Sequence, residues 1–108
     1  MRRGAFVSVA VQGDFGKPRP ALVVQSDHFG GHSTIAVLLL TTSLADAPLI
    51  RIEVQPSSQN GLRLPSQIMI DKIMTIKKKK IGSAIGMADD GLMLEVGRRL
   101  AVFLGVVS

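Results

Sequence analysis

The stretch Gly16-Lys17-Pro18-Arg19-Pro20-Ala21-Leu22-Val23-Val24 joins a basic, proline-rich start to an apolar run. Pro18 and Pro20 fix their own φ angles, and Pro20 also biases Arg19 away from the helical region. Residues 21–25 then predict a β-strand, because branched apolar residues suit a pleated, buried surface. We therefore expect Arg19 at the mouth of a strand, on a stiffened backbone.

Outward from this segment, the chain continues to read as short strands. Residues 5–12 alternate so that one face is apolar, which is typical of a half-buried strand. Residues 34–40 are apolar on both faces, which indicates a central strand or a strand covered by a partner. Further strands are expected at 49–54, 67–75 and 81–85.

The end of the chain changes to helical spacing. Asp89 or Asp90 is a suitable N-cap, and Gly105 is placed to end the helix. Between them, apolar residues recur three or four positions apart, at Leu92, Val96, Leu100, Phe103 and Leu104. The sequence thus predicts one small α+β barrel of five or six strands with a C-terminal helix, in a single domain over residues 1–108.

Composition narrows the class of protein. Thirteen Lys and Arg against eight Asp and Glu give a net charge of +5, which favours polyanionic partners such as nucleic acid. The absence of cysteine excludes disulfides and thiolate metal sites. The apolar heart of the longest chargeless stretch, 35–40, is far shorter than the ~20 residues that span a bilayer. We expect a soluble, cytoplasmic protein with no membrane association.

Several residues have two interpretations. Arg19 could meet a phosphate, because charge held in place suits electrostatic catalysis, or it could be an ordinary surface arginine. Phe15 could stack on an unpaired base or fold back onto the barrel. His28 and His32 are four apart, but glycines make a helical metal pair unfavourable. The lysine run 77–80 could be a solvated turn or a phosphate contact.

Taken in order, these segments resemble the MazF/PemK toxin family. Residues 2–4 and 16–27 are similar to its opening strand, R-R-G-[DE], and its G-x-x-R-P-x-[LV]-V-[IV] segment. Residues 40–43 look like its "[IL]-T-S" strand end, and 66–76 look like its "S-x-[IV]-x-[CL]-[DE]-Q-[IP]-R-T-[IV]" strand. The amphipathic segment after Asp89 also fits, so the resemblance covers nearly the whole chain.

The resemblance implies a fold, an activity and partners. The fold is an SH3-like barrel of about five to seven strands with a C-terminal helix, and the protein works as a homodimer. The activity is that of a type II toxin: a sequence-specific endoribonuclease that cuts single-stranded RNA without a metal or other cofactor. A cognate antitoxin protein is the expected inhibitor. By position, Arg19 and Thr42 match the family's catalytic residues, and Asp71 falls where many members carry an acid.

These residue types suit metal-free RNA cleavage. The neighbouring 2′-OH is then the nucleophile, so one group must accept its proton and another must stabilise the phosphoryl oxygens. Arg19 suits the second task, Thr42 can donate a hydrogen bond, and Asp71 could accept the proton or orient the group that does. Residues expected to contact RNA are Asp14, Phe15, Gly16, Lys17 and Gln67.

The sequence departs from the family pattern at a few positions and leaves other functions open. Met74 stands where the family usually has arginine, and Lys72 where it often has glutamine.

One alternative function is that of a non-catalytic gyrase poison of the CcdB kind, although the ending 105–108 lacks an aromatic residue. Another is a barrel that only binds RNA or an antitoxin. The RNA recognition sequence, the antitoxin and the general acid are not assigned by any motif.

Overall fold

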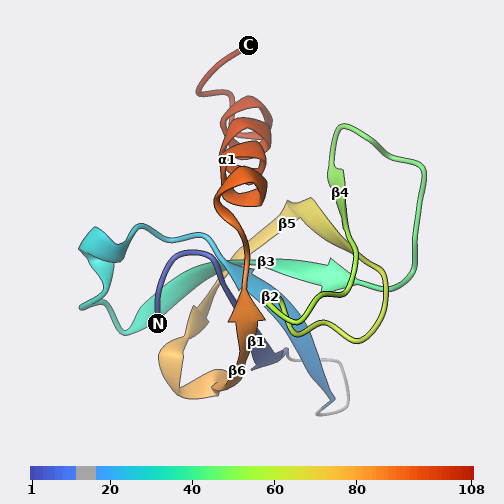
Figure 1. The fold of residues 1–108 in the computed structure, drawn as a ribbon. Helices are drawn as coiled ribbons and strands as arrows, with labels where there is room; N and C mark the ends of the chain where they lie inside the picture. The colour runs from blue at the N-terminus through green and yellow to red at the C-terminus, as the bar shows by residue number, and fades with distance from the viewer. Residues whose placement is uncertain (12–16) are drawn as a thin grey trace.

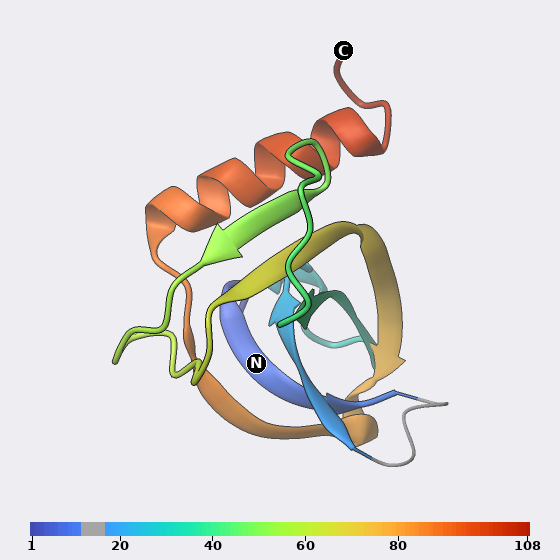
Figure 2. The same cartoon turned by 90° about the vertical axis from the view of Figure 1, so that its right-hand side faces the viewer.

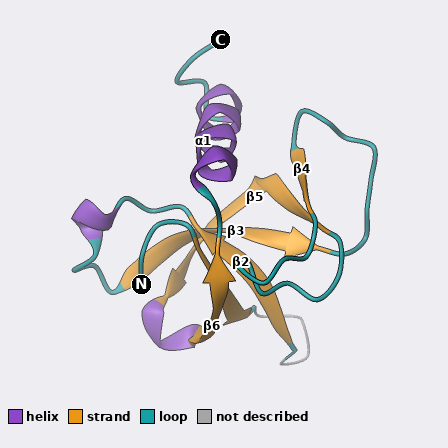
Figure 3. Cartoon of the chain, viewed as in Figure 1, coloured by secondary structure: helices purple, strands orange, loops and turns teal. Residues whose placement is uncertain are grey.

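A computed structural model describes residues 1–11 and 17–108 of the chain. Six strands form one antiparallel sheet in the order β4-β5-β3-β2-β1-β6 (Figure 1). The strands are β1 (Ala5–Ala10), β2 (Pro18–Val23), β3 (Thr34–Thr41), β4 (Arg51–Val54), β5 (Ser66–Lys77) and β6 (Ile81–Met87). Two short 3₁₀ helices, η1 (Asp27–Phe29) and η2 (Lys78–Lys80), precede the C-terminal helix α1 (Asp90–Phe103). The expected mostly β barrel with a terminal helix is confirmed (Figure 3).

The alternation along the central strands divides their side chains between two apolar clusters. Phe6, Leu22 and Leu38 are neighbours across β1, β2 and β3, and they belong to the cluster that also holds residues of α1. Their chain neighbours, such as Val7 and Ala21, enter the second cluster. Both faces of β3 are therefore buried within one chain. This explains its continuous apolar sequence as that of a central strand, without a partner.

Helix α1 begins and ends as its sequence predicts. Asp89 is the N-cap, and its carboxylate accepts a hydrogen bond from the Leu92 backbone N–H at 2.7 Å. At the other end, Gly105 has φ +76° and Val106 N donates to Ala101 O at 2.8 Å, which is a Schellman ending. The helix lies alongside β4 (Figure 2). Among the described residues, no helix is long and apolar enough to cross a membrane.

Strand β2 begins at Pro18, three residues earlier than expected. A proline has no N–H to donate to a ladder, so it is confined to strand starts and unpaired edges. Residues 18–20 pair only with β1, whereas pairing with β3 begins at Ala21, opposite Leu39. The prolines thus belong to the part of β2 that pairs with β1 alone.

Two glycines allow the loop between β4 and β5 to pack directly against β6. A Cβ on Gly61, whose φ is +70°, would lie 2.1 Å from the Ile85 carbonyl oxygen. A Cβ on Gly86 would lie 2.4 Å from the Gln59 carbonyl oxygen. Main-chain atoms occupy the space where side chains would otherwise stand, and Met87 N donates to Gln59 O at 2.9 Å. This contact brings residues 61–64 to the mouth of the barrel.

Candidate active site

Arg19 and Thr42 line the same groove, although they are far apart in the sequence. Strands β2 and β3 are antiparallel, and extending their register beyond the Ala21–Leu39 pair brings Arg19 level with Thr41. The start of one strand therefore meets the end of the other. The groove has a volume of about 560 Å³. Its other lining residues come from β1, β2, β5, β6 and the β4–β5 loop: Ser8, Pro18, Pro20, Gly61, Leu62, Arg63, Leu64, Ser66, Ser83, Ala84 and Ile85.

The β4–β5 loop adds a second arginine to this groove, Arg63, which sequence reasoning missed. Buried Asn60 fixes the loop: its Oδ1 accepts from Ser57 N at 3.0 Å and Leu62 N at 2.9 Å, and its Nδ2 donates to Gln55 O at 2.9 Å. The exposed Arg63 follows directly on this ordered turn. No local pattern marks it as functional, because its approach to Arg19 depends on the packing of Gly61 against β6.

The segment after Thr42 is held by a buried glutamine. Gln67 is 3% exposed, and its side-chain amide makes two hydrogen bonds with Ala45: Oε1 accepts from Ala45 N and Nε2 donates to Ala45 O, both at 3.0 Å. Arg51 Nη1 donates to Gln67 Oε1 at 2.8 Å and to Ser43 O at 3.3 Å. We call these two side chains the Gln67–Arg51 clamp. An RNA contact from Gln67, as the sequence led us to expect, would have to replace bonds that position the Thr42 segment.

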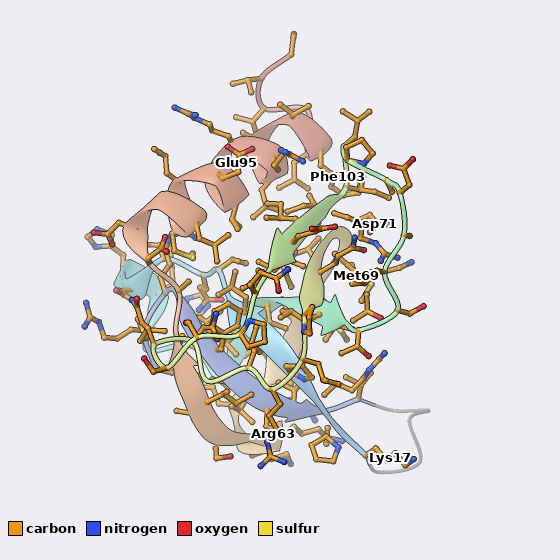
Figure 4. All side chains as sticks on the ribbon, turned by 45° about the vertical axis from the view of Figure 1, so that its right-hand side comes forward. Lys17, Arg63, Met69, Asp71, Glu95 and Phe103 are labelled. Atoms are coloured by element: carbon orange, nitrogen blue, oxygen red, sulfur yellow. The ribbon has the colours of Figure 1, made fainter. Side chains whose placement is uncertain are left out.

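Asp71 lies outside the groove formed by Arg19 and Thr42. It is on β5, four residues beyond Gln67, and Figure 4 shows it on the side that carries α1, with Lys17 and Arg63 at the opposite end. Its Oδ2 is 3.9 Å from Lys72 Nζ, and its Oδ1 is buried without a hydrogen-bond partner among the described residues. Among the described residues, Lys72 is thus the ion-pair partner of Asp71. Since Lys72 is largely exposed, that pair contributes little to stability.

Of the other residues expected to contact RNA, the structure describes only Lys17. Lys17 is exposed at the start of β2, at the same end of the molecule as Arg63 (Figure 4). Asp14, Phe15 and Gly16 lie outside the described residues. In the described part of the chain, no three or more His, Cys, Asp or Glu side chains are grouped to hold a metal ion.

The groove is suited to a phosphodiester. Its described lining carries two guanidinium groups, from Arg19 and Arg63, and no carboxylate. It also carries the hydroxyls of Thr42, Ser8, Ser66 and Ser83. A guanidinium presents a planar fork that matches phosphate oxygens and keeps its charge. The hydroxyls add donors for oxygens that the arginines leave free. An anion with several oxygens is therefore the ligand class that these residues favour.

Comparison with known proteins gives the family of the chain. The model of a family described as "PemK-like, MazF-like toxin of type II toxin-antitoxin system" matches residues 2–104. The chain is 39% identical to the "Probable endoribonuclease MazF" of Mycolicibacterium smegmatis, over 100% of both chains. It is 27% identical to the endoribonuclease EndoA of Bacillus subtilis, over 96% of this chain and 90% of the other.

Solved structures share the fold. An endoribonuclease in complex with its cognate antitoxin, from a mycobacterial species, superposes with a TM-score of 0.84 at 22% identity, over 100% of this chain and 98% of that chain. The family match spans nearly the full sequence, and the sequence resemblance noted above runs through the same segments. The chain belongs to the family of PemK-like, MazF-like toxins of type II toxin–antitoxin systems.

Proposed function

We propose that the chain is a toxin endoribonuclease that cuts single-stranded RNA at specific sequences, in the cytoplasm, without a metal ion. The observation that carries the proposal is the meeting of Arg19 and Thr42 in one basic groove with no carboxylate among its described lining residues. A negatively charged backbone fits such a groove, and the activity of the two relatives named above is of the same class. Cleavage of mRNA by such an enzyme stops translation and growth.

The groups in the groove support cleavage by attack of the neighbouring 2′-hydroxyl. The 2′-oxygen attacks the adjacent phosphorus as its proton leaves, the bond to the 5′-oxygen breaks, and that oxygen takes up a proton. The products are a 2′,3′-cyclic phosphate and a free 5′-hydroxyl. Arg19 stabilises the charge that grows on the phosphoryl oxygens, and Thr42 donates to one of them. The stiff strand start and the Gln67–Arg51 clamp hold both groups in place before RNA arrives.

Asp71 remains our candidate for the proton acceptor or its helper, under a geometric condition. Because it lies outside the groove of its own chain, it reaches the reacting hydroxyl only if the bound RNA extends along β5 or a second copy brings it there. Its buried, unpaired Oδ1 is an acceptor that no described side chain satisfies. Loss of cleavage in Asp71→Asn, with RNA affinity unchanged, supports this role; full activity removes it.

A homodimer is supported by apolar surface on α1. A groove of about 740 Å³ runs along the helix, and its lining is almost entirely apolar apart from Arg3 and Arg98. Leu94, at its edge, is 61% exposed, and Val102 and Val107 are also exposed. Gly97 and Ala101 keep the helix surface low enough for close approach. We assign this face to a second copy of the chain, because two such helices bury each other's apolar residues.

The charge of the groove supports an acidic antitoxin partner. An acidic, disordered segment that folds across the groove would neutralise Arg19 and Arg63 and exclude RNA. Its binding should weaken with salt, as expected for contacts between opposite charges. A complex whose affinity does not change when Arg19, Lys17 and the lysine run are all replaced would contradict this arrangement.

The decisive experiment is incubation of the purified protein with a long single-stranded RNA in excess EDTA. We expect discrete fragments with cyclic phosphate ends from the wild type and from the control Arg2→Ala, and intact RNA from Arg19→Ala and Thr42→Val. Arg2 is an exposed arginine outside the groove, so it matches the loss of charge without the loss of the site. Intact RNA from a folded wild type would refute the proposal, and a gyrase supercoiling assay would then test the poison alternative.

A further inference from the structure

A second basic surface lies apart from the groove, where η1 and η2 come together. Residue Thr34 pairs with Lys77 across β3 and β5, and Lys78 N donates to Ser33 O at 2.9 Å. The Lys78 ammonium group also bonds the Gly30 carbonyl oxygen. Figure 3 shows the two short helices on the same side of the barrel. We call this surface the aromatic–lysine patch; it consists of His28, Phe29, His32, Lys77, Lys78, Lys79 and Lys80.

The patch combines exposed aromatic rings with lysines. Phe29 is 53% exposed, whereas Phe6 is completely buried in the core. The ring centroids of Phe29 and His32 are 5.6 Å apart, and the rings meet edge to face. The two rings therefore do not stack face to face on each other. In the described part of the chain, no carboxylate forms an ion pair with Lys79 or Lys80. Proteins that bind single-stranded nucleic acid combine a cationic surface with exposed aromatic rings in this way.

The lysine run alone would be ordinary, because a charge run at a turn is commonly a solvated tip. Two features argue that this turn has a binding role. Lys78 is tied to the aromatic loop, so the loop and the lysine turn keep a fixed relative position. The single nearby carboxylate of the loop, Asp27, accepts from the backbone N–H of Arg3 at 2.8 Å.

Strand β6 connects the patch to the groove. It starts directly after Lys80, and its residues Ser83, Ala84 and Ile85 line the groove, whereas no patch residue does. Ser83 lies three steps of extended chain beyond Lys80, which is about 10 Å. A single RNA strand that occupies the groove therefore needs to continue only a short way along β6 to reach the lysine turn, to which the aromatic loop is tied through Lys78.

We propose that the aromatic–lysine patch is a second binding surface for single-stranded RNA, which holds the part of a long substrate that leaves the groove. Bases stack on Phe29 and His32, and the lysines contact phosphates. The inference rests on the proposed ribonuclease function and extends it: the groove performs cleavage, and the patch raises affinity for long RNA. Substrates that fill only the groove gain nothing from it.

The test compares long and short RNA. Two uncleavable 2′-O-methyl RNAs, of about 6 and about 30 nucleotides, both carry the cut sequence found with the wild type. Their dissociation constants are measured by fluorescence anisotropy for Phe29→Ala and for Lys79→Ala/Lys80→Ala, over a range of salt concentrations. Controls are Leu49→Ala, which removes an apolar side chain that is 83% exposed, and Arg2→Ala, which removes an exposed charge.

We expect Phe29→Ala to weaken binding of the long RNA about 5- to 10-fold, as for loss of a stacked base, and to leave the short RNA unchanged. The double lysine variant should lower the slope of log K against log salt by roughly 1.4 for the long RNA only, at about 0.7 per lost phosphate contact. Equal effects on both RNAs, or none on either, overturn the proposal. A wild type that binds RNA but never cleaves it would defeat the ribonuclease function separately.

Discussion

Replacing Gln67 by leucine removes the centre of the Gln67–Arg51 clamp while keeping a side chain of similar size. Three hydrogen bonds are lost: two between the amide and the Ala45 backbone, and one from the Arg51 guanidinium. Leucine fills the space but satisfies none of these groups. The backbone after Thr42 then keeps two hydrogen bonds at Ser43: its O accepts from Arg51 Nη1 at 3.3 Å, and its N donates to Thr41 Oγ1 at 3.0 Å.

The expected loss of stability is moderate. A neutral hydrogen bond contributes about 0.5–1.5 kcal/mol net, and one to a charged group about 1.5–3 kcal/mol. Ala45 is exposed, so water can replace the two bonds that it loses, and the burial of leucine offsets part of the rest. We estimate a decrease of about 2 to 3 kcal/mol in the free energy of unfolding, from the lower ends of these ranges. A domain with a stability of ~5–15 kcal/mol remains folded.

The effect on cleavage should be larger than on binding. A displacement of about 1 Å at a catalytic group can lower the rate about 100-fold. The assay is urea unfolding, followed by cleavage kinetics on a short RNA substrate. We expect kcat to fall about 10- to 100-fold with little change in KM, since the arginines proposed to bind phosphate are not altered. Gln67→Glu, which keeps the acceptors for Ala45 N and Arg51 but not the donor, should retain most of the activity.

The control is Gln55→Leu, at an exposed position that takes no part in the hydrogen bonds of the clamp. It should change neither stability nor kcat. The reasoning is refuted if Gln67→Leu unfolds at the wild-type urea concentration and cleaves at the wild-type rate. A rise in KM with kcat unchanged would also refute it, and would instead restore the sequence-based expectation that Gln67 contacts RNA.

Three further predictions test the fold and the assembly. Gly61→Ala should lower the free energy of unfolding by more than about 2 kcal/mol in urea, because the new Cβ would clash with the Ile85 carbonyl and the backbone there is left-handed. The control Gly31→Ala places its Cβ in open space and should be neutral. Asp89→Ala should lower the unfolding free energy by about 1 kcal/mol through loss of the helix cap, with RNA cleavage retained. Leu94→Glu should shift sedimentation from dimer to monomer without unfolding the chain, and a variant that still sediments as a dimer would exclude the α1 face as the interface.

Much of the fold could be predicted from local pattern. The alternation in 5–12 indicates β1, and the capping aspartate and the terminal glycine mark both ends of α1, because these signals depend on neighbours a few residues away. The start of β2 could not be placed, because prolines are tolerated there only where β3 has not yet begun to pair. Where β3 begins to pair with β2 depends on the whole sheet and cannot be read from residues 18–23 alone.

The candidate site was predictable in part, for a similar reason. Arg19 and Thr42 carry a family signature in their own segments, and the structure brings them to one groove. Arg63 and the structural role of Gln67 have no local signature, since each depends on a partner far along the chain: the Ile85 carbonyl that Gly61 packs against, and the Ala45 backbone. Contacts of that kind become visible only when the chain is folded.

The way the groove is built argues for a site that is ordered before substrate binds. Arg19 is placed by a backbone with few accessible conformations, and Thr42 by a buried amide whose hydrogen bonds are already formed in the free chain. Donors fixed in this way need no reorganisation as charge develops on the phosphoryl oxygens, which is the condition for strong electrostatic stabilisation. Affinity for a long RNA can then come from the aromatic–lysine patch without disturbing these donors. Substitutions in the patch should therefore change KM for long substrates, whereas substitutions in the clamp should change kcat for all of them.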